Sequence, residues 1–97
     1  MPTSVVLMKL TDQGIRDIKN APQRIEQGIK GLEAVGGKMI GFYSVMGEYD
    51  YVAIAEVPSD EVGVGFTLAL GSQGNVRTTT LRAFTKEQFA EVVKKLP

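Results

Sequence analysis

"KMIGFYSVMGEYDYVAIAEV", residues 38–57, holds two apolar segments that are separated by Gly47 and Glu48. Both segments are rich in β-branched and aromatic residues, which is typical of strands. A two-residue loop that begins with glycine is a favoured hairpin connection. The stretch therefore predicts a β-hairpin with strands over 38–46 and 49–57 and with Gly47-Glu48 as its turn.

The residues before this hairpin predict a strand, a loop or an irregular turn, and a helix. The segment 4–10 is apolar and β-branched, whereas 11–22 is polar and is interrupted by Gly14, which we expect to have a positive φ. Pro22 suits the first turn of a helix because its missing N–H would have no partner there. The helix then carries Ile25, Ile29 and Leu32 at helical spacing and ends at Gly36-Gly37.

The residues after the hairpin predict two more helices around a fourth strand. Pro58 stops the third strand, and Ser59 or Asp60 can cap the next helix. The fourth strand is expected over 75–84, and Thr85 with Gln88 has the spacing of a capping box. The apolar residues of the last helix are expected to face inward: Phe89, Val92, Val93 and Leu96.

The expected order is βαββαβ with an extra C-terminal helix. This order is the ferredoxin-like pattern, in which a four-stranded antiparallel sheet carries two helices on one face. A chain of 97 residues is too short for two cores, so residues 1–97 are expected to form one α+β domain.

The second face of this sheet is also expected to be apolar. Val5 and Leu7 oppose Val6, Met8 and Leu10 on the first strand, so neither side of that strand is polar. On the second strand, Met39, Tyr43 and Val45 are expected to oppose Ile40, Phe42 and Met46. On the third strand, Tyr49, Tyr51, Ala53 and Ala55 are expected to oppose Val52 and Ile54. A second copy packed sheet to sheet, as in a dimeric α/β barrel, would cover this face, and higher oligomers are open. The alternative is that the last helix folds across it.

Composition excludes several classes of function. The chain has no cysteine and no histidine, which removes the commonest metal ligands and the usual general base, so we expect no metal and no cofactor. The formal net charge is zero without a basic stripe, which disfavours nucleic acid. No segment has the length of a membrane span or the pattern of a signal peptide, so a cytoplasmic location is the expectation.

Several separated motifs resemble the GYD domain family, and together they span nearly the whole chain. These motifs are "TDQGI" at 11–15, "APQR" at 21–24, "GGK" at 36–38, "GFYSVMGEYDYV" at 41–52 and "GNVRTTTLRAF" at 74–84. The Gly-x-Tyr-Asp motif stands here as Gly47, Glu48, Tyr49 and Asp50. The resemblance implies a ferredoxin-like, dimeric α+β barrel type of fold, and it implies no particular activity.

Asp50 and Arg24 are charged residues at positions where we expect each to have a hydrogen-bond or ion-pair partner. Asp50 follows the predicted turn, where it could accept from a local N–H, pair with Arg24 or Lys38, or orient a ligand. Arg24 lies in the first turn of a helix, which favours anions, so it is expected to meet either Asp50 or a ligand carboxylate or phosphate; the alternative is a solvated surface arginine.

We therefore expect a binding site made from Arg24, Tyr43, Asp50, Thr11 and Lys38. The predicted function is binding or sensing of an unidentified small molecule in a mostly apolar pocket. One alternative is a cofactor-independent monooxygenase or isomerase, in which Asp50, Glu48, a tyrosine or a lysine would do the acid–base work. A second alternative is a structural or protein-interaction role. Binding is favoured over catalysis.

Overall fold

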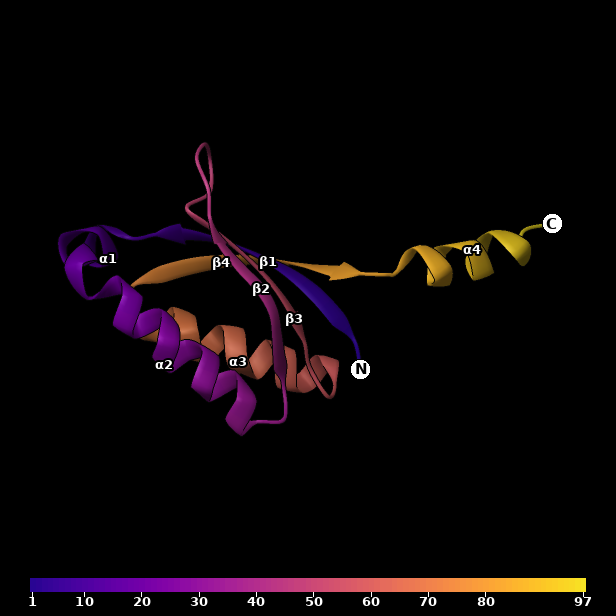
Figure 1. The fold of residues 1–97 in the computed structure, drawn as a ribbon, viewed down its shortest axis with the longest axis horizontal. Helices are drawn as coiled ribbons and strands as arrows, with labels where there is room; N and C mark the ends of the chain where they lie inside the picture. Colours follow the sequence, from indigo (N-terminus) through magenta and orange to yellow (C-terminus); the bar gives the residue numbers. More distant parts are fainter.

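A computed structural model describes residues 1–97 (Figure 1). The four strands are β1 (Thr3–Leu10), β2 (Lys38–Ser44), β3 (Tyr51–Glu56) and β4 (Val76–Ala83). The helices are α1 (Asp12–Arg16), a 3₁₀ turn (Ile18–Asn20), α2 (Ala21–Ala34), α3 (Asp60–Ser72) and α4 (Lys86–Lys94).

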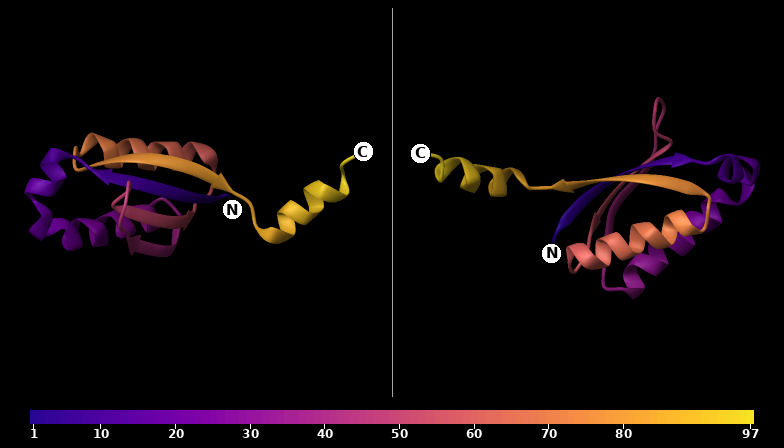
Figure 2. Two further views of the ribbon diagram at one scale, coloured as in Figure 1. Left: turned by 90° about the horizontal axis from the view of Figure 1, so that it is seen from above. Right: turned by 180° about the vertical axis from the view of Figure 1, so that it is seen from behind.

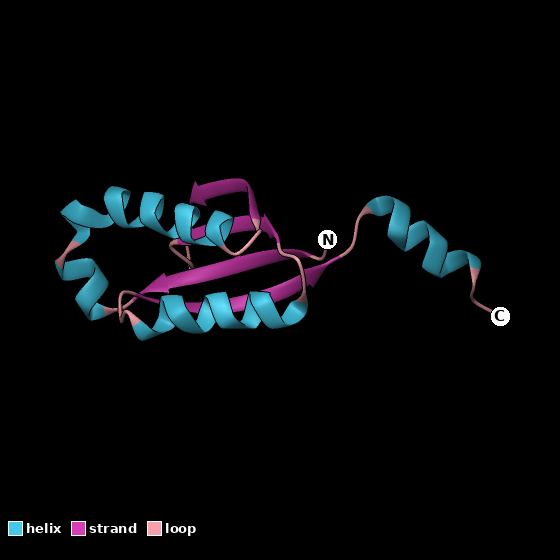
Figure 3. Ribbon diagram, turned by 90° about the horizontal axis from the view of Figure 1, so that it is seen from below, coloured by secondary structure: helices cyan, strands magenta, loops and turns pink.

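The strands form one antiparallel sheet in the order β2-β3-β1-β4. The helices α2 and α3 lie on the same side of this sheet, and no helix covers its other side, which we call the open face (Figures 1 and 3). This arrangement confirms the predicted ferredoxin-like α+β fold.

The chain between β1 and α2 is helical, so the predicted loop over 11–22 is wrong. Thr11 caps α1 by accepting a hydrogen bond from the N–H of Gly14 at 3.1 Å, and a 3₁₀ turn then leads into α2. Gly14 does not have a positive φ; that conformation is found at Gly36, Gly47 and Gly74. A Cβ atom at Gly14 would lie 2.2 Å from the carbonyl oxygen of Asn75, so this glycine is required by close approach of two backbones.

The hairpin of β2 and β3 is confirmed, but its connection is longer than the predicted two residues. β2 ends at Ser44 and β3 begins at Tyr51, and the loop closes through a 2.9 Å hydrogen bond from the N–H of Val45 to the carbonyl of Asp50. The N–H of Asp50 donates to the carbonyl of Met8 at 2.9 Å. β1 therefore fixes the main chain at Asp50, and the residues around Gly47 form the tip of the hairpin.

A register shift between Met39 and Gly41 changes which side chains of β2 share a face. Met39 lies opposite Ala55 and Phe42 opposite Ala53, on the helix-covered side, whereas Tyr43 lies opposite Val52 on the open face. The predicted division of β2 was wrong because the extra residue of a bulge reverses the alternation beyond it.

The helix-covered side holds a small core. Its two clusters are centred on Met8, Tyr51 and Ala53 and on Leu32, Ala55 and Val57, and only eight of the 97 residues are buried. Leu32, at 1% exposure, is the only large side chain that is fully enclosed.

The last helix does not pack on the domain. Figure 2 shows α4 extending away from the sheet, and its apolar residues, predicted to face inward, are exposed: Phe89, Val92, Val93 and Leu96. Thr85 and Gln88 form the predicted capping box, so the helix begins where expected. The prediction that α4 packs against the rest of the chain is wrong, because no other part of the chain lies against the apolar side of this helix. None of the helices combines the length and hydrophobicity that crossing a bilayer requires.

Candidate functional site

The five predicted site residues do not lie together. Arg24 is on α2, Thr11 caps α1, Lys38 begins β2, Tyr43 is near the end of β2, and Asp50 is in the hairpin loop. Only Arg24 lines the cavity between the sheet and the helices. The predicted pocket around Arg24, Tyr43 and Asp50 is therefore not assembled within one chain.

Asp50 has a backbone partner. Its carboxylate oxygen Oδ2 accepts a hydrogen bond from the N–H of Leu10 at 2.8 Å. Leu10 is the last residue of β1, whereas the pairing of β1 with β3 ends at Met8 and Tyr51, so no residue of β3 lies opposite Leu10. The carboxylate therefore replaces a missing strand neighbour. Neither Arg24 nor Lys38 is its ion-pair partner.

Arg24 pairs with Asp17, the residue before the 3₁₀ turn. Its Nη1 lies 2.9 Å from the Asp17 carboxylate and 2.8 Å from the Asp17 carbonyl, and its Nη2 lies 3.3 Å from the carbonyl of Gly14. The expected pairing of Arg24 with Asp50 is thus wrong, because the acid that meets Arg24 is Asp17 from the segment before α2. The Arg24 side chain is 21% exposed and holds α1 against α2.

Thr11 ties the end of β1 to the segment between α3 and β4. Its hydroxyl donates to the carbonyl of Gly74, and its N–H donates to the carbonyl of Asn75 at 3.0 Å. Gln13 adds hydrogen bonds from its amide nitrogen to the Gln73 carbonyl at 3.1 Å and to the Asn75 side chain at 3.2 Å. These hydrogen bonds join residues 11–14 to residues 73–75, so the role of Thr11 is to hold the start of α1 against the segment that leads into β4.

Tyr43 and Lys38 lie on the open side of β2. Tyr43 is 58% exposed, and its ring lies over Gly41, where a Cβ atom would be 3.0 Å from the ring. Lys38 is exposed and lies opposite Glu56 of β3. Both residues are therefore placed to contact a molecule on the open face.

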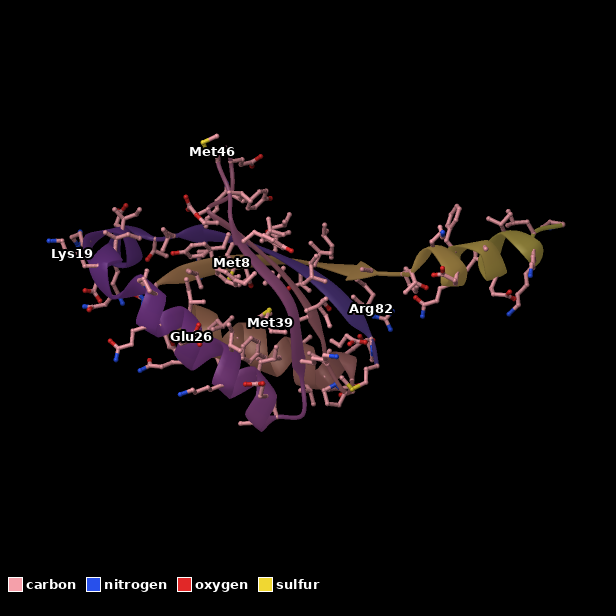
Figure 4. All side chains as sticks on the ribbon, in the orientation of Figure 1. Met8, Lys19, Glu26, Met39, Met46 and Arg82 are labelled. Atoms are coloured by element: carbon pink, nitrogen blue, oxygen red, sulfur yellow. The ribbon has the colours of Figure 1, made fainter.

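A cavity of about 80 Å³ lies between the sheet and the two helices. Its apolar walls come from Met8 and Leu10 of β1, Met39 and Phe42 of β2, Tyr51 of β3 and Ile25 and Ile29 of α2, with Phe66 and Leu70 of α3. Ala21, Gly28 and Val76 also line it, and its polar lining residues are Arg24, Gln73 and Asn75. Figure 4 shows Met8 and Met39 between the sheet and the helices, far from Met46 at the hairpin tip.

The sequence did not identify Tyr51, Gln73 and Asn75 as site residues. Tyr51 lies on the same side of β3 as Ala53 and Ala55. This alternation along the strand could have predicted that Tyr51 faces the helices. Gln73 and Asn75 belong to a glycine-rich segment whose neighbour in space, Arg24, is distant in the sequence. No local pattern connects these residues.

The open face is largely apolar. Strand registers place Val5, Leu7, Val52 and Ile54 together at its centre, with Tyr43 and Leu81 on the two edge strands. The apolar residues of α4 add a second unpartnered surface. The outer side of α3 adds a third, because Val64 and Leu68 are exposed on a helix that carries no charge after Glu61.

The chain exposes more surface than a compact monomer of its mass. Its accessible surface is 6737 Å², whereas a folded monomer of 10.5 kDa exposes about 5,400 Å². Its radius of gyration is 14.8 Å, against about 12.5 Å for a compact chain of this length. The excess of about 1,300 Å² exceeds the roughly 800 Å² that each partner buries in a standard protein interface.

Comparison with known proteins gives one family and several relatives. The sequence model of the GYD domain matches residues 5–93. A protein of Thermus thermophilus named "Glutamine synthetase and cystathionine beta-lyase binding protein" is 37% identical over 84 residues, which make up 86% of this chain and 88% of that protein.

Two solved structures share the fold. The leucine response regulatory protein LrpA of Mycobacterium tuberculosis superposes with a TM-score of 0.66 at 24% identity over 88% of this chain and 51% of that one, so this chain spans about half its length. TTHA0845 of Thermus thermophilus superposes with a TM-score of 0.54 at 26% identity, over 88% of this chain and 95% of that one.

Proposed function

Because the chain belongs to the GYD domain family, we propose that it is a homodimeric binding module for other proteins, in which a second copy covers the open face of the sheet. The observation that carries the dimer is the apolar centre of that face, formed by Val5, Leu7, Val52 and Ile54. A face of this kind favours a self-complementary contact, since two copies related by a twofold axis bury the same residues.

We assign α4 to the same assembly. A helix of nine residues is marginal in water without packing, so α4 needs a surface for its apolar side. It follows β4 almost directly, and Leu81 of β4 lies on the open face. A second copy on that face would meet α4 as well, which accounts for two of the three unpartnered surfaces.

The substitution Ile54→Asp is expected to convert the dimer into a monomer. A carboxylate at the centre of an apolar interface loses its water without gaining a partner, which outweighs the free energy of association. In the isolated chain Ile54 is only partly buried, so the fold is expected to remain. Sedimentation equilibrium at micromolar concentration should give twice 10.5 kDa for the unmodified chain and 10.5 kDa for the variant.

The matched control is Met46→Asp, which introduces the same charge at a side chain that is 98% exposed on the hairpin tip. This control is expected to sediment as the dimer. An unmodified chain that sediments as a monomer, or an Ile54→Asp variant that stays dimeric, would show that the open face is not the interface.

The proposal of protein partners is supported by the relative that is named as a binding protein for two enzymes. The outer side of α3 suits such a role because it lies on the opposite side of the sheet from the dimer face. Val64 and Leu68 would thus remain exposed after dimerisation. The acids considered for catalysis, Glu48 and Asp50, lie in the hairpin loop outside the cavity, so binding is the better-supported function.

Purified glutamine synthetase and cystathionine beta-lyase from the source organism provide the direct test. We expect saturable binding of at least one of them to the immobilised full chain, measured by interferometry. Leu68→Asp is expected to weaken this binding at least tenfold, because it places a charge on the outer side of α3. Met46→Asp should bind like the unmodified chain. Absence of binding to both enzymes would reject this partner class.

A further inference from the structure

The cavity between the sheet and the helices has an apolar body of limited size. Its volume of about 80 Å³ is roughly half that of an engineered 150 Å³ apolar cavity that binds benzene. A proportionate occupant is an aliphatic chain of about three or four carbons. Met8, Met39 and Phe42 form the walls that such a chain would contact.

One end of the cavity is polar and rich in hydrogen-bond donors. Arg24, Gln73 and Asn75 line it, and no acidic residue does. Arg24 is already paired with the Asp17 carboxylate, but its hydrogen bonds to Asp17 and Gly14 use only its two Nη atoms, so its Nε–H has no protein acceptor. Ala21, the first residue of α2, also lines the cavity, and Asn20 gives that helix no side-chain cap.

Tyr51 provides a second polar contact. It lines the cavity and is 8% exposed, and its ring packs on Phe42 with the centroids 5.1 Å apart. Its hydroxyl makes no hydrogen bond within the protein. No buried side-chain oxygen of the protein lacks a partner, so this hydroxyl is accessible from the cavity or the solvent and can donate a hydrogen bond to a ligand with a polar atom.

The geometry points to a binding site for a short aliphatic carboxylic acid, with its carboxylate at Arg24 and its alkyl chain between Met8, Met39 and Phe42. Arginine suits the carboxylate because its Nε–H, which has no protein acceptor, can donate a charge-assisted hydrogen bond to a carboxylate oxygen. The methionine side chains suit the alkyl chain because they are apolar and flexible. The site lies on the opposite side of the sheet from the face assigned to the second copy, and it does not depend on the proposed protein partners.

The ligand would enter between α2 and α3. An outer groove along these helices shares five residues with the cavity: Arg24, Gly28, Phe66, Leu70 and Gln73. At Gly28 a Cβ atom would make an ordinary van der Waals contact with Leu70 at 3.9 Å, so the two helices approach each other here without a larger side chain between them. Two of the shared residues, Arg24 and Gln73, are polar, so the polar end of the cavity is the end that connects with the groove.

The test uses the methyl groups of the four methionines as NMR reporters. Methyl spectra of ¹³C-methionine-labelled full chain are recorded during titration with butanoate, and with butan-1-ol and acetate as controls. Butanoate is expected to shift Met8 and Met39, which line the cavity, with a millimolar or tighter affinity. Met1 and Met46, which are exposed, should not shift. Butan-1-ol lacks the charge and acetate lacks the chain, so each should bind at least tenfold more weakly.

Arg24→Gln is expected to weaken butanoate binding at least tenfold and to leave butan-1-ol binding unchanged. Arg16→Gln removes the same charge from an exposed arginine of α1 that does not line the cavity, and it should bind butanoate normally. Equal affinities for butanoate and butan-1-ol on the unmodified chain would overturn the carboxylate assignment, even if Arg24→Gln does not fold. If neither compound shifts Met8 and Met39, the site itself is rejected.

Discussion

Alanine in place of Gly14 is expected to destabilise the fold by at least about 3 kcal/mol, a large part of the roughly 5–15 kcal/mol that holds such a domain together. The new Cβ would lie 2.2 Å from the carbonyl oxygen of Asn75 and 3.0 Å from the Leu10 side chain. The first neighbour is backbone, so it cannot move without breaking the hydrogen bond that it accepts from the N–H of Thr11 at 3.0 Å. Urea denaturation at one fixed protein concentration measures the effect.

Gly65 offers the matched control, because it is also a helical glycine and no atom lies within 4 Å of its would-be Cβ. Gly65→Ala is expected to raise stability by about 0.5–1 kcal/mol through the higher helix propensity of alanine. The fixed concentration matters, since dimerisation would make the midpoint concentration-dependent. An unchanged midpoint for Gly14→Ala would mean that the two backbones are not in close contact.

Asp50→Ala is expected to reduce stability by about 1–3 kcal/mol, because the N–H of Leu10 loses the acceptor that it has at 2.8 Å. Asp50→Asn retains an oxygen at the same position and is expected to lose much less. The comparison distinguishes a hydrogen-bonding role, which the amide can fulfil, from a role that needs the negative charge. Thermal and urea unfolding of both variants provide the measurement.

Glu48→Ala is the control for Asp50, since Glu48 lies in the same loop with a 72% exposed side chain and a long 3.4 Å contact to Lys9. Its effect should remain within about 0.5 kcal/mol. If Asp50→Asn were as damaging as Asp50→Ala, the charge rather than the acceptor would be important, and a missing cationic partner would have to be sought in the assembly.

The strand and helix order could be predicted because its signals are local. Apolar runs around Gly47, the proline at 22 and the Thr85–Gln88 capping box each depend on a few neighbouring residues. The length of the hairpin loop could not be predicted in this way. It depends on Asp50 pairing through its main chain and side chain with β1, which is distant in the sequence.

The candidate site was less predictable than the fold for the same reason. The Asp17–Arg24 pair spans only seven residues, and the acid was available as a partner in the sequence. The cavity, by contrast, gathers side chains from β1, β2, β3 and both covering helices. The bulge after Met39 decides that Met39 and Phe42 reach it together, and a single sequence gives no sign of that bulge.

The position of β1 between β3 and β4 has a consequence for synthesis of the chain. β1 is made before β4, but its pairing with β4 requires residues 76–83, which emerge more than 60 residues later. Contacts of such long sequence separation form slowly. A nascent chain that ends before Val76 therefore presents β1 with an unpaired edge, and such edges promote aggregation. We therefore expect the nascent chain, until residues 76–83 have emerged, to be more prone to aggregation than the finished domain.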